Sequence, residues 1–185
     1  MKDCARFGLC EQGGRQKVIL GAMMIFIFFC AVGCAQPVGV GVLDGLQYDC
    51  VVLANHTGIY AEQLGKIVCL SKSMSITALS VGHTIRNNYT QAVFFANVTG
   101  IYLINAHAGR YVANEEGYLT WGFEAPRLIE KAGSVTSLVL EEPGEWPGVG
   151  YMWPALIFTN ETGAYRMFNI GEIGKQEVIC IWRCT

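Results

Sequence analysis

The sequence predicts an all-β fold, and three observations support this. Short apolar runs of about five residues, rich in β-branched and aromatic side chains, alternate with Gly- and Asn-containing turns, which is typical of β-hairpins. Glycine makes up 22 of the 185 residues, about 12% against a usual ~7%, which favours many turns. Beyond the apolar leader, no stretch keeps a helical period for more than two turns.

Residues 1–35 are predicted to be a secretory signal peptide. A basic start is followed by the uncharged run 18–35, which ends in small residues, so cleavage is expected near Ala35. An uncleaved signal-anchor is an alternative, since 18 apolar residues as a helix nearly span the ~30 Å hydrocarbon core. A lipoprotein site at 31–34 is a further alternative. Each places the remainder outside the membrane, so the expected localisation is secreted or extracellular.

The next segment, 36–46, is Gly- and Val-rich and is expected to be a flexible arm before the folded domain, 47–185. Four N-x-[ST] sequons lie in the chain after the leader and fit an extracellular address. They predict N-glycosylation at Asn55, Asn88, Asn97 and Asn160. If all four carry glycans, all four must lie on the surface.

Four cysteines remain once the leader is removed, namely Cys50, Cys69, Cys180 and Cys184. In a secreted domain they predict up to two disulfides, with three possible connectivities. A bridge from Cys50 to Cys180 or Cys184 would tie the two ends of the domain together, whereas Cys69 could instead be a buried free thiol.

The folded domain is expected to contain three structural repeats. The tetrapeptides NHTG, NVTG and NETG resemble a repeat, but their glycines are spaced unequally, by 42 and 63 residues. Aligning Gly58, Gly109 and Gly163 gives spacings of 51 and 54, with an aromatic residue two positions later in each unit. Three units of about 50 residues predict a β-trefoil, and the closure of its barrel would remove open sheet edges. A generic antiparallel barrel or sandwich is the alternative.

Charge and motifs exclude several function classes. The formal net charge is −2, which argues against a basic nucleic-acid-binding protein. The three histidines lie far apart near turns, and no H-E-x-x-H, G-x-S-x-G or C-x-x-C motif occurs. We therefore expect neither an enzyme, nor a cofactor, nor a metal site.

A Pro-, Gly- and aromatic-rich segment surrounds Trp146 and Tyr151. Aromatic side chains are strong anchors at protein interfaces. The segment is therefore either a lid on the barrel or an exposed contact, and these two residues are the candidate receptor contacts.

Several segments, in order over 47–182, resemble the fibroblast growth factor family. The clearest is 98–121, where Gly109-Arg110-Tyr111 precedes Gly117-Tyr118-Leu119 as in that family's Gly-x-Tyr…Gly-x-Leu pattern. Residues 47–70, 137–146, 153–167 and 174–182 resemble other strands of the family, Cys50 included, and 72–90 resembles an insertion.

The resemblance implies a secreted ligand for a receptor tyrosine kinase of the fibroblast growth factor receptor class, assisted by heparan sulfate. The matching sulfate site is 160–175, where the only cations, Arg166 and Lys175, lie among Glu161 and Glu172. Useful sulfate affinity needs several charge-assisted contacts. We therefore expect heparan sulfate dependence to be weak or lost, or another coreceptor to be used.

Two other functions remain open at the level of the sequence. The chain could be an interleukin-one-type trefoil cytokine or a receptor decoy. It could also be a membrane-anchored surface glycoprotein that uses the trefoil as a scaffold, which an uncleaved leader would favour; only in that case is a membrane involved. In each case the domain acts by surface complementarity, and the assignment rests on analogy.

Overall fold

The computed structural model describes residues 37–44, 49–72, 75–83, 90–113, 119–141, 144–146, 150–152, 154–170 and 175–184. Every regular element in these ranges is a β-strand, which confirms the all-β prediction. The expectations for the leader 1–35 and for Asn88 concern residues outside these ranges.

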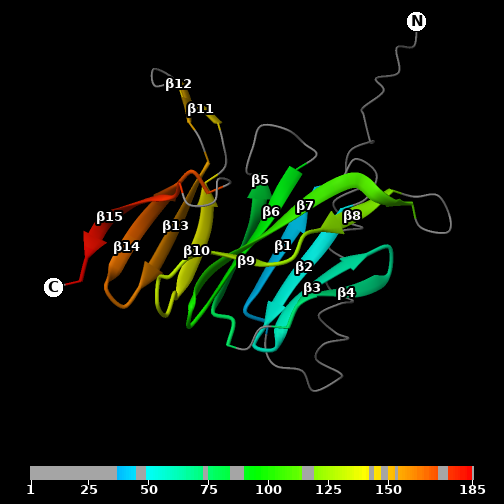
Figure 1. Cartoon of the computed structure of the whole chain (residues 1–185), viewed down its shortest axis with the longest axis horizontal. Helices are drawn as coiled ribbons and strands as arrows, with labels where there is room; N and C mark the ends of the chain where they lie inside the picture. The colour runs from blue at the N-terminus through cyan, green and yellow to red at the C-terminus, as the bar shows by residue number, and fades with distance from the viewer. Residues whose placement is uncertain are drawn as a thin grey trace, which may run out of the picture. The chain divides into compact units, whose positions relative to one another are not determined.

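The strands form three antiparallel sheets and a separate two-stranded ribbon (Figure 1). Sheet A consists of β1 (Gly39–Leu43), β2 (Cys50–Asn55), β3 (Gly58–Gln63) and β4 (Lys66–Ser71), in that order. Sheet B consists of β5 (Ala78–His83), β6 (Thr90–Asn97), β7 (Gly100–Ala113) and β8 (Leu119–Phe123), with β9 (Arg127–Glu130) also paired to β7. Sheet C consists of β10 (Ser137–Glu141), β13 (Ala155–Asn160), β14 (Gly163–Phe168) and β15 (Glu177–Arg183). The ribbon is β11 (Gly144–Trp146) with β12 (Gly150–Met152).

Sheet B lies between the other two sheets and is covered on both faces. Alternate residues of β6 point in opposite directions: Ala92, Phe94 and Ala96 pack with sheet C, while Val93 and Phe95 pack with sheet A. A strand that is buried on both faces needs a continuous apolar run rather than an alternating one. This requirement explains the sequence AVFFA at 92–96.

The segment expected to be a flexible arm contains strand β1. Residues 39–43 pair in register with β2, and Leu43 is fully buried. A Cβ on Gly39 would lie 2.8 Å from Leu79 Cβ, and Gly41 approaches Val81 just as closely. The alternating glycines therefore allow β1 to lie directly on β5, so that sheets A and B can pack together.

Two glutamine side chains join sheets A and B through backbone atoms. Gln91 on β6 is buried; its Nε2 donates to the Asp44 carbonyl at 3.0 Å and its Oε1 accepts from the Asp44 N–H at 3.3 Å. Gln63 on β3 of sheet A bonds in turn to β8 of sheet B, where its Oε1 accepts from the Trp121 N–H at 2.9 Å. These bonds link the two sheets through side-chain amides.

The β-trefoil is not confirmed. Among the described strands, no strand of sheet A, B or C pairs in a backbone ladder with a strand of another of these sheets. A trefoil barrel requires its repeats to be joined into one closed ring of strands. The described strands instead form open sheets packed face to face, which is closer to the sandwich alternative.

The predicted alignment of the repeats through Gly109 is wrong. Residues 106–109 are not a turn but continue β7, where Ala106, His107 and Ala108 pair with β8. The repeating units are the tetrapeptides with unequal spacing, each of which forms the turn of a central hairpin: β2–β3, β6–β7 and β13–β14. Their spacing is unequal because the insertions between repeats, including β8 and the β11–β12 ribbon, differ in length.

Candidate functional site

The repeated Asn-x-Thr-Gly-x-Tyr hairpin turn has the same hydrogen bonds in all three sheets. In the middle copy, Asn97 Oδ1 accepts from the Thr99 N–H at 2.8 Å and from Thr99 Oγ1 at 2.6 Å, and Thr99 Oγ1 lies 2.7 Å from Tyr102 Oη. The first and third copies repeat these contacts. Asparagine and threonine are thus selected here by turn geometry.

The glycine of each turn lies against the backbone of a third strand, beside the two strands of the hairpin. A Cβ there would overlap a carbonyl oxygen: Ser71 beside Gly58, Glu130 beside Gly100, and Trp182 beside Gly163. Each of these third strands, β4, β9 or β15, meets the hairpin at a bulge just before the tyrosine. The motif therefore specifies a hairpin together with a third, closely packed strand.

The predicted glycosylation sites Asn55 and Asn97 are buried, with exposed fractions of 6% and 8%. Asn160 is half-buried, and its Nδ2 donates to the Ala132 carbonyl at 2.7 Å. A glycan is attached through this same amide nitrogen. The surface position that glycans on all four sequons would require is therefore not met in the folded domain at Asn55 and Asn97, whose side chains bond within the turn.

None of the four described cysteines is in a disulfide. Cys50 is buried between sheets A and B, and burial, followed by the charge of Glu62, raises its thiol pKa to about 12. Cys180 lies in sheet C, on the far side of sheet B, and packed sheets are about 10 Å apart. The expected bridge from Cys50 to Cys180 or Cys184 is therefore not formed. The buried free thiol is Cys50, whereas Cys69 is exposed.

The predicted sulfate-binding cation Arg166 is already engaged. On β14 its guanidinium donates to the Glu141 carboxylate of β10, and its Cζ lies 5.0 Å from the centroid of the Phe168 ring. Lys175 is exposed, and its carbonyl accepts from Asn169 Nδ2 at 3.2 Å. Of the two cations, Arg166 is therefore already paired with a carboxylate.

The candidate receptor contacts lie on the ribbon. Trp146 is on β11 and Tyr151 on β12, and the register pairs Trp146 with Gly150 and Glu145 with Tyr151. The ribbon strands pair with each other and with no other described strand. In the chain the ribbon falls between β10 and β13, two neighbouring strands of sheet C (Figure 1). It therefore carries two aromatic residues on an extension of the sheet.

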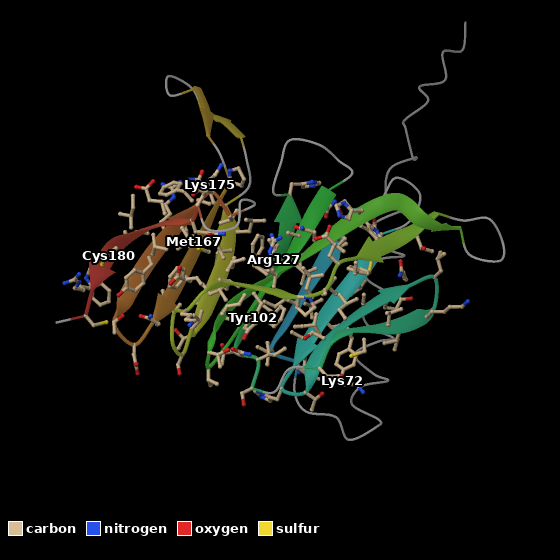
Figure 2. The ribbon with its side chains drawn as sticks, viewed as in Figure 1. Lys72, Tyr102, Arg127, Met167, Lys175 and Cys180 are labelled. Atoms are coloured by element: carbon tan, nitrogen blue, oxygen red, sulfur yellow. The ribbon has the colours of Figure 1, made fainter. Side chains whose placement is uncertain are left out.

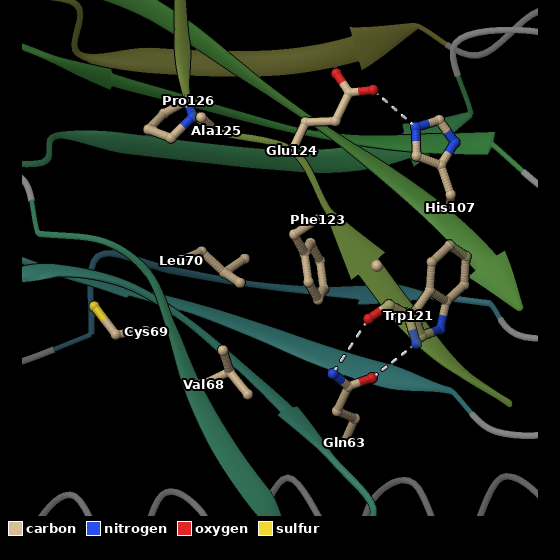
Figure 3. A pocket seen from close by; sticks show the side chains of 11 residues that line it. Gln63, Val68, Cys69, Leu70, His107, Trp121, Phe123, Glu124, Ala125 and Pro126 are labelled. Atoms are coloured by element: carbon tan, nitrogen blue, oxygen red, sulfur yellow. Dashed lines mark hydrogen bonds and ion pairs between the residues drawn. The ribbon is translucent and has the colours of Figure 1, made fainter. Parts of the chain in front are cut away.

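A pocket of about 740 Å³ lies between sheet A and the end of sheet B (Figure 3). Its apolar wall comes from β4 and from the segment between β8 and β9, with Val68, Leu70, Phe123 and Pro126 among its residues. Gln63 lines the pocket, and Figure 3 shows its side-chain amide hydrogen-bonded to both the N–H and the carbonyl of Trp121.

A polar corner of this pocket is formed by His107 and Glu124. His107 Nε2 lies 3.0 Å from Glu124 Oε1, and Asn105 Nδ2 donates to Glu124 Oε2 at 2.7 Å. The hydrogen bond from His107, followed by that from Asn105, lowers the pKa of the Glu124 carboxyl. The carboxylate is about half exposed. The pocket suits a mixed apolar and cationic group such as a partner's side chain; sequence reasoning missed it because its walls come from distant segments.

The outermost strand of sheet C is an exposed apolar surface. All seven residues of β15 are exposed, including Ile181 at 56% and Trp182 at 62%. Figure 2 labels Cys180 on this strand. Solvent exposure of contiguous large apolar side chains marks an interaction surface or an aggregation liability.

Comparison of the chain with family models, curated proteins and solved structures gives no match. The described residues contain no helix long and apolar enough to cross a membrane.

Proposed function

We propose that this protein is an extracellular growth-factor-like ligand that binds a receptor ectodomain by surface complementarity. The observation that carries the proposal is the β11–β12 ribbon, which pairs only with itself among the described strands and carries Trp146 and Tyr151 on opposing strands. Aromatic residues lose little side-chain entropy on binding and dominate interface energetics. The basic start and apolar run of the leader support an extracellular location.

The receptor class in this proposal is a receptor tyrosine kinase of the fibroblast growth factor receptor type. It is supported by the ordered resemblance over 47–182. Part of that resemblance assumes a turn at Gly109, but Gly109 lies within strand β7. Receptor binding does not require a β-trefoil, because a ribbon on a stack of open sheets can contact a receptor equally well.

Heparan sulfate dependence is proposed to be weak. Arg166 is neutralised by Glu141, so a sulfate group would have to displace an existing ion pair. Electrostatic recognition of a polyanion needs a local basic patch. A different coreceptor remains compatible with this arrangement.

The test is binding of the full chain, expressed with its own leader in secretory cells, to immobilised receptor ectodomains, with and without heparin. We expect nanomolar binding to the fibroblast growth factor receptor class and a change of less than about twofold on adding heparin. Trp146→Ala and Tyr151→Ala should each weaken binding about tenfold or more, as truncated interface anchors do.

Val98→Ala, in the exposed β6–β7 turn, is the control and should leave affinity unchanged. Binding only to interleukin-one-type receptors would refute the proposed receptor class but would leave the ribbon as the proposed contact surface. Product that stays in the membrane and binds neither class would support the anchored glycoprotein and refute the ligand.

A further inference from the structure

Strand β15 presents an open edge with an apolar surface. In sheet C it pairs with β14, and no other described strand pairs with it. Open edges of this kind pair readily with further strands, and proteins that avoid this place charges within the strand. In β15 the only charged residues are the first and the last, Glu177 and Arg183, while the interior is apolar apart from Cys180.

The sequence of β15, EVICIWR, is complementary to itself in the antiparallel direction. When two copies are aligned about their central residue, Cys180, each Glu177 lies opposite Arg183 of the other copy. The intervening residues then form apolar pairs. Cross-strand pairs of opposite charge and of apolar residues both stabilise antiparallel sheets.

The equivalent edge strand of sheet A lacks this property. Strand β4 follows the same hairpin turn, and Cys69 pairs with Tyr60 as Cys180 pairs with Tyr165. Self-pairing of KIVCLS would place Lys66 opposite Ser71, so no charge is matched. One face of β4 also borders the pocket.

We propose that β15 is a homodimer interface through which two copies of this chain join edge to edge. The four strands of sheet C from each copy then form one antiparallel sheet of eight. A two-fold axis through the middle of β15 makes the contact isologous, with the same residues contributed by both copies. The interface is independent of the receptor proposed above.

The bulge between β14 and β15 does not argue against this pairing. Bulges can twist an edge away from further strands. The same bulge, however, occurs between β3 and β4 and between β7 and β9, so it belongs to the repeated hairpin.

The first test is a charge swap in the full chain, expressed with its own leader and without a C-terminal tag, which would lie beside β15. Glu177→Arg and Arg183→Glu, made singly, each place like charges opposite one another twice per dimer. Each should raise the dimer dissociation constant about tenfold in sedimentation equilibrium. The double variant restores both pairs and should return to within about twofold of the wild type.

The second test blocks the edge itself. Ile181→Lys places a charge within β15 and should make the protein monomeric at concentrations where the wild type is dimeric. Ile67→Lys places the same charge on the exposed edge strand β4 and should leave the dimer intact. Wild type that stays monomeric up to about 100 µM, which corresponds to about 5.5 kcal/mol of binding free energy, or a dimer sensitive only to Ile67→Lys, would overturn the proposal.

A third test uses Cys180 as a proximity probe. Directly opposed residues in antiparallel strands have Cα atoms about 4.5–5.5 Å apart, within the range of a disulfide. Oxidised glutathione supplies the oxidant: two thiols lose two protons and two electrons to form one interchain disulfide, and the glutathione is released as two reduced molecules.

The expected product is a dimer on non-reducing gels that Cys180→Ser abolishes and Cys69→Ser leaves unchanged. A cross-link that survives Cys180→Ser would place the interface elsewhere and refute the proposed register.

Discussion

Strands β6 and β15 have similar apolar compositions but opposite surroundings. The residues 92–96 of β6 are almost completely buried because sheet A covers one face and sheet C the other. Strand β15 has seven exposed residues, four of them large and apolar. Both strands belong to an Asn-x-Thr-Gly-x-Tyr repeat: β6 leads into its turn, and β15 closes the third copy.

The comparison teaches that an apolar strand is not by itself evidence of a core. The run in β6 is explained by contacts within the chain. The apolar residues of β15 are not buried by any described part of the chain. Contact with another molecule would explain their hydrophobicity.

The largest contrast is expected from truncating one aromatic side chain in each strand. Phe94→Ala should lower the free energy of unfolding by about 3–5 kcal/mol, since it leaves a cavity between sheets B and C. Trp182→Ala should change it by no more than about 0.5 kcal/mol. Urea unfolding monitored by circular dichroism, at a concentration where the protein is monomeric, measures both.

If Phe94→Ala does not fold, Phe94→Leu should still show a larger loss than Trp182→Ala. Equal losses would mean that β15 is covered within the chain.

The next contrast concerns the attachment of β15 to its sheet. Gly163→Ala introduces a Cβ that overlaps the Trp182 carbonyl and should cost about 1–3 kcal/mol. Gly65→Ala is the matched control, because Gly65 also has a positive φ, +75°, but has no atom near the new Cβ. It should cost about 1–2 kcal/mol at most. Hydrogen exchange should show faster opening of β15 in the Gly163 variant alone, and protected amides there would contradict the prediction.

A smaller difference is expected between two copies of the turn. Asn97→Ala leaves the Thr99 N–H without its acceptor and removes one of two partners of the Thr99 hydroxyl at a partly buried position, and should cost about 1–2 kcal/mol. Asn160→Ala removes the equivalent turn bonds and the bond to the Ala132 carbonyl. Water can replace the turn bonds at this exposed position, so the loss should be smaller. Thermal unfolding of the two variants measures the order, and a reversed order would show that burial of the turn does not decide its energetics.

The smallest effect is expected at Glu124, at the edge of the pocket. Its carboxyl pKa is lowered in the folded state, so the interaction stabilises the fold above the ordinary carboxyl pKa of about 4.3 and is lost as pH falls through the folded value. Glu124→Gln should therefore slightly lower the melting temperature at pH 7, and this difference should shrink as the pH falls below the ordinary carboxyl pKa. Glu161→Gln, in an exposed turn, is the control. A difference that persists at low pH would contradict this assignment.

Part of the fold was predictable from local pattern alone. Turn residues and β-branched runs identified hairpins such as β2–β3 and β13–β14, because hairpin chemistry is local. Equal spacing predicts the wrong alignment of the repeat, whereas the turn chemistry of Asn97 and Thr99 gives the alignment that the structure shows. Strand β1 was missed because alternating glycines resemble a flexible arm until Leu79 and Val81 are seen against them.

The candidate sites were less predictable, since they depend on which segments the sheets bring together. Arg166 could be named as a cation, but its neutralisation depends on Glu141 from β10, 25 residues earlier. Trp146 and Tyr151 were identified from composition, and their receptor role stays a prediction. The pocket joins residues of β4 to the segment after β8, a juxtaposition that no local pattern encodes.

The repeated turn has a consequence for biosynthesis, because the same three residues that cap each hairpin also form a sequon. In a chain that enters the secretory pathway, as proposed, glycosyl transfer to Asn97 competes with closure of the β6–β7 hairpin. Once the hairpin has closed, the Asn97 amide is buried and the glycosyltransferase can no longer reach it. Hairpins close in microseconds once the chain is free, but during synthesis the partner strand must first emerge. The fraction of molecules that carry a glycan at Asn97 would therefore increase with the time for which the turn stays open during synthesis.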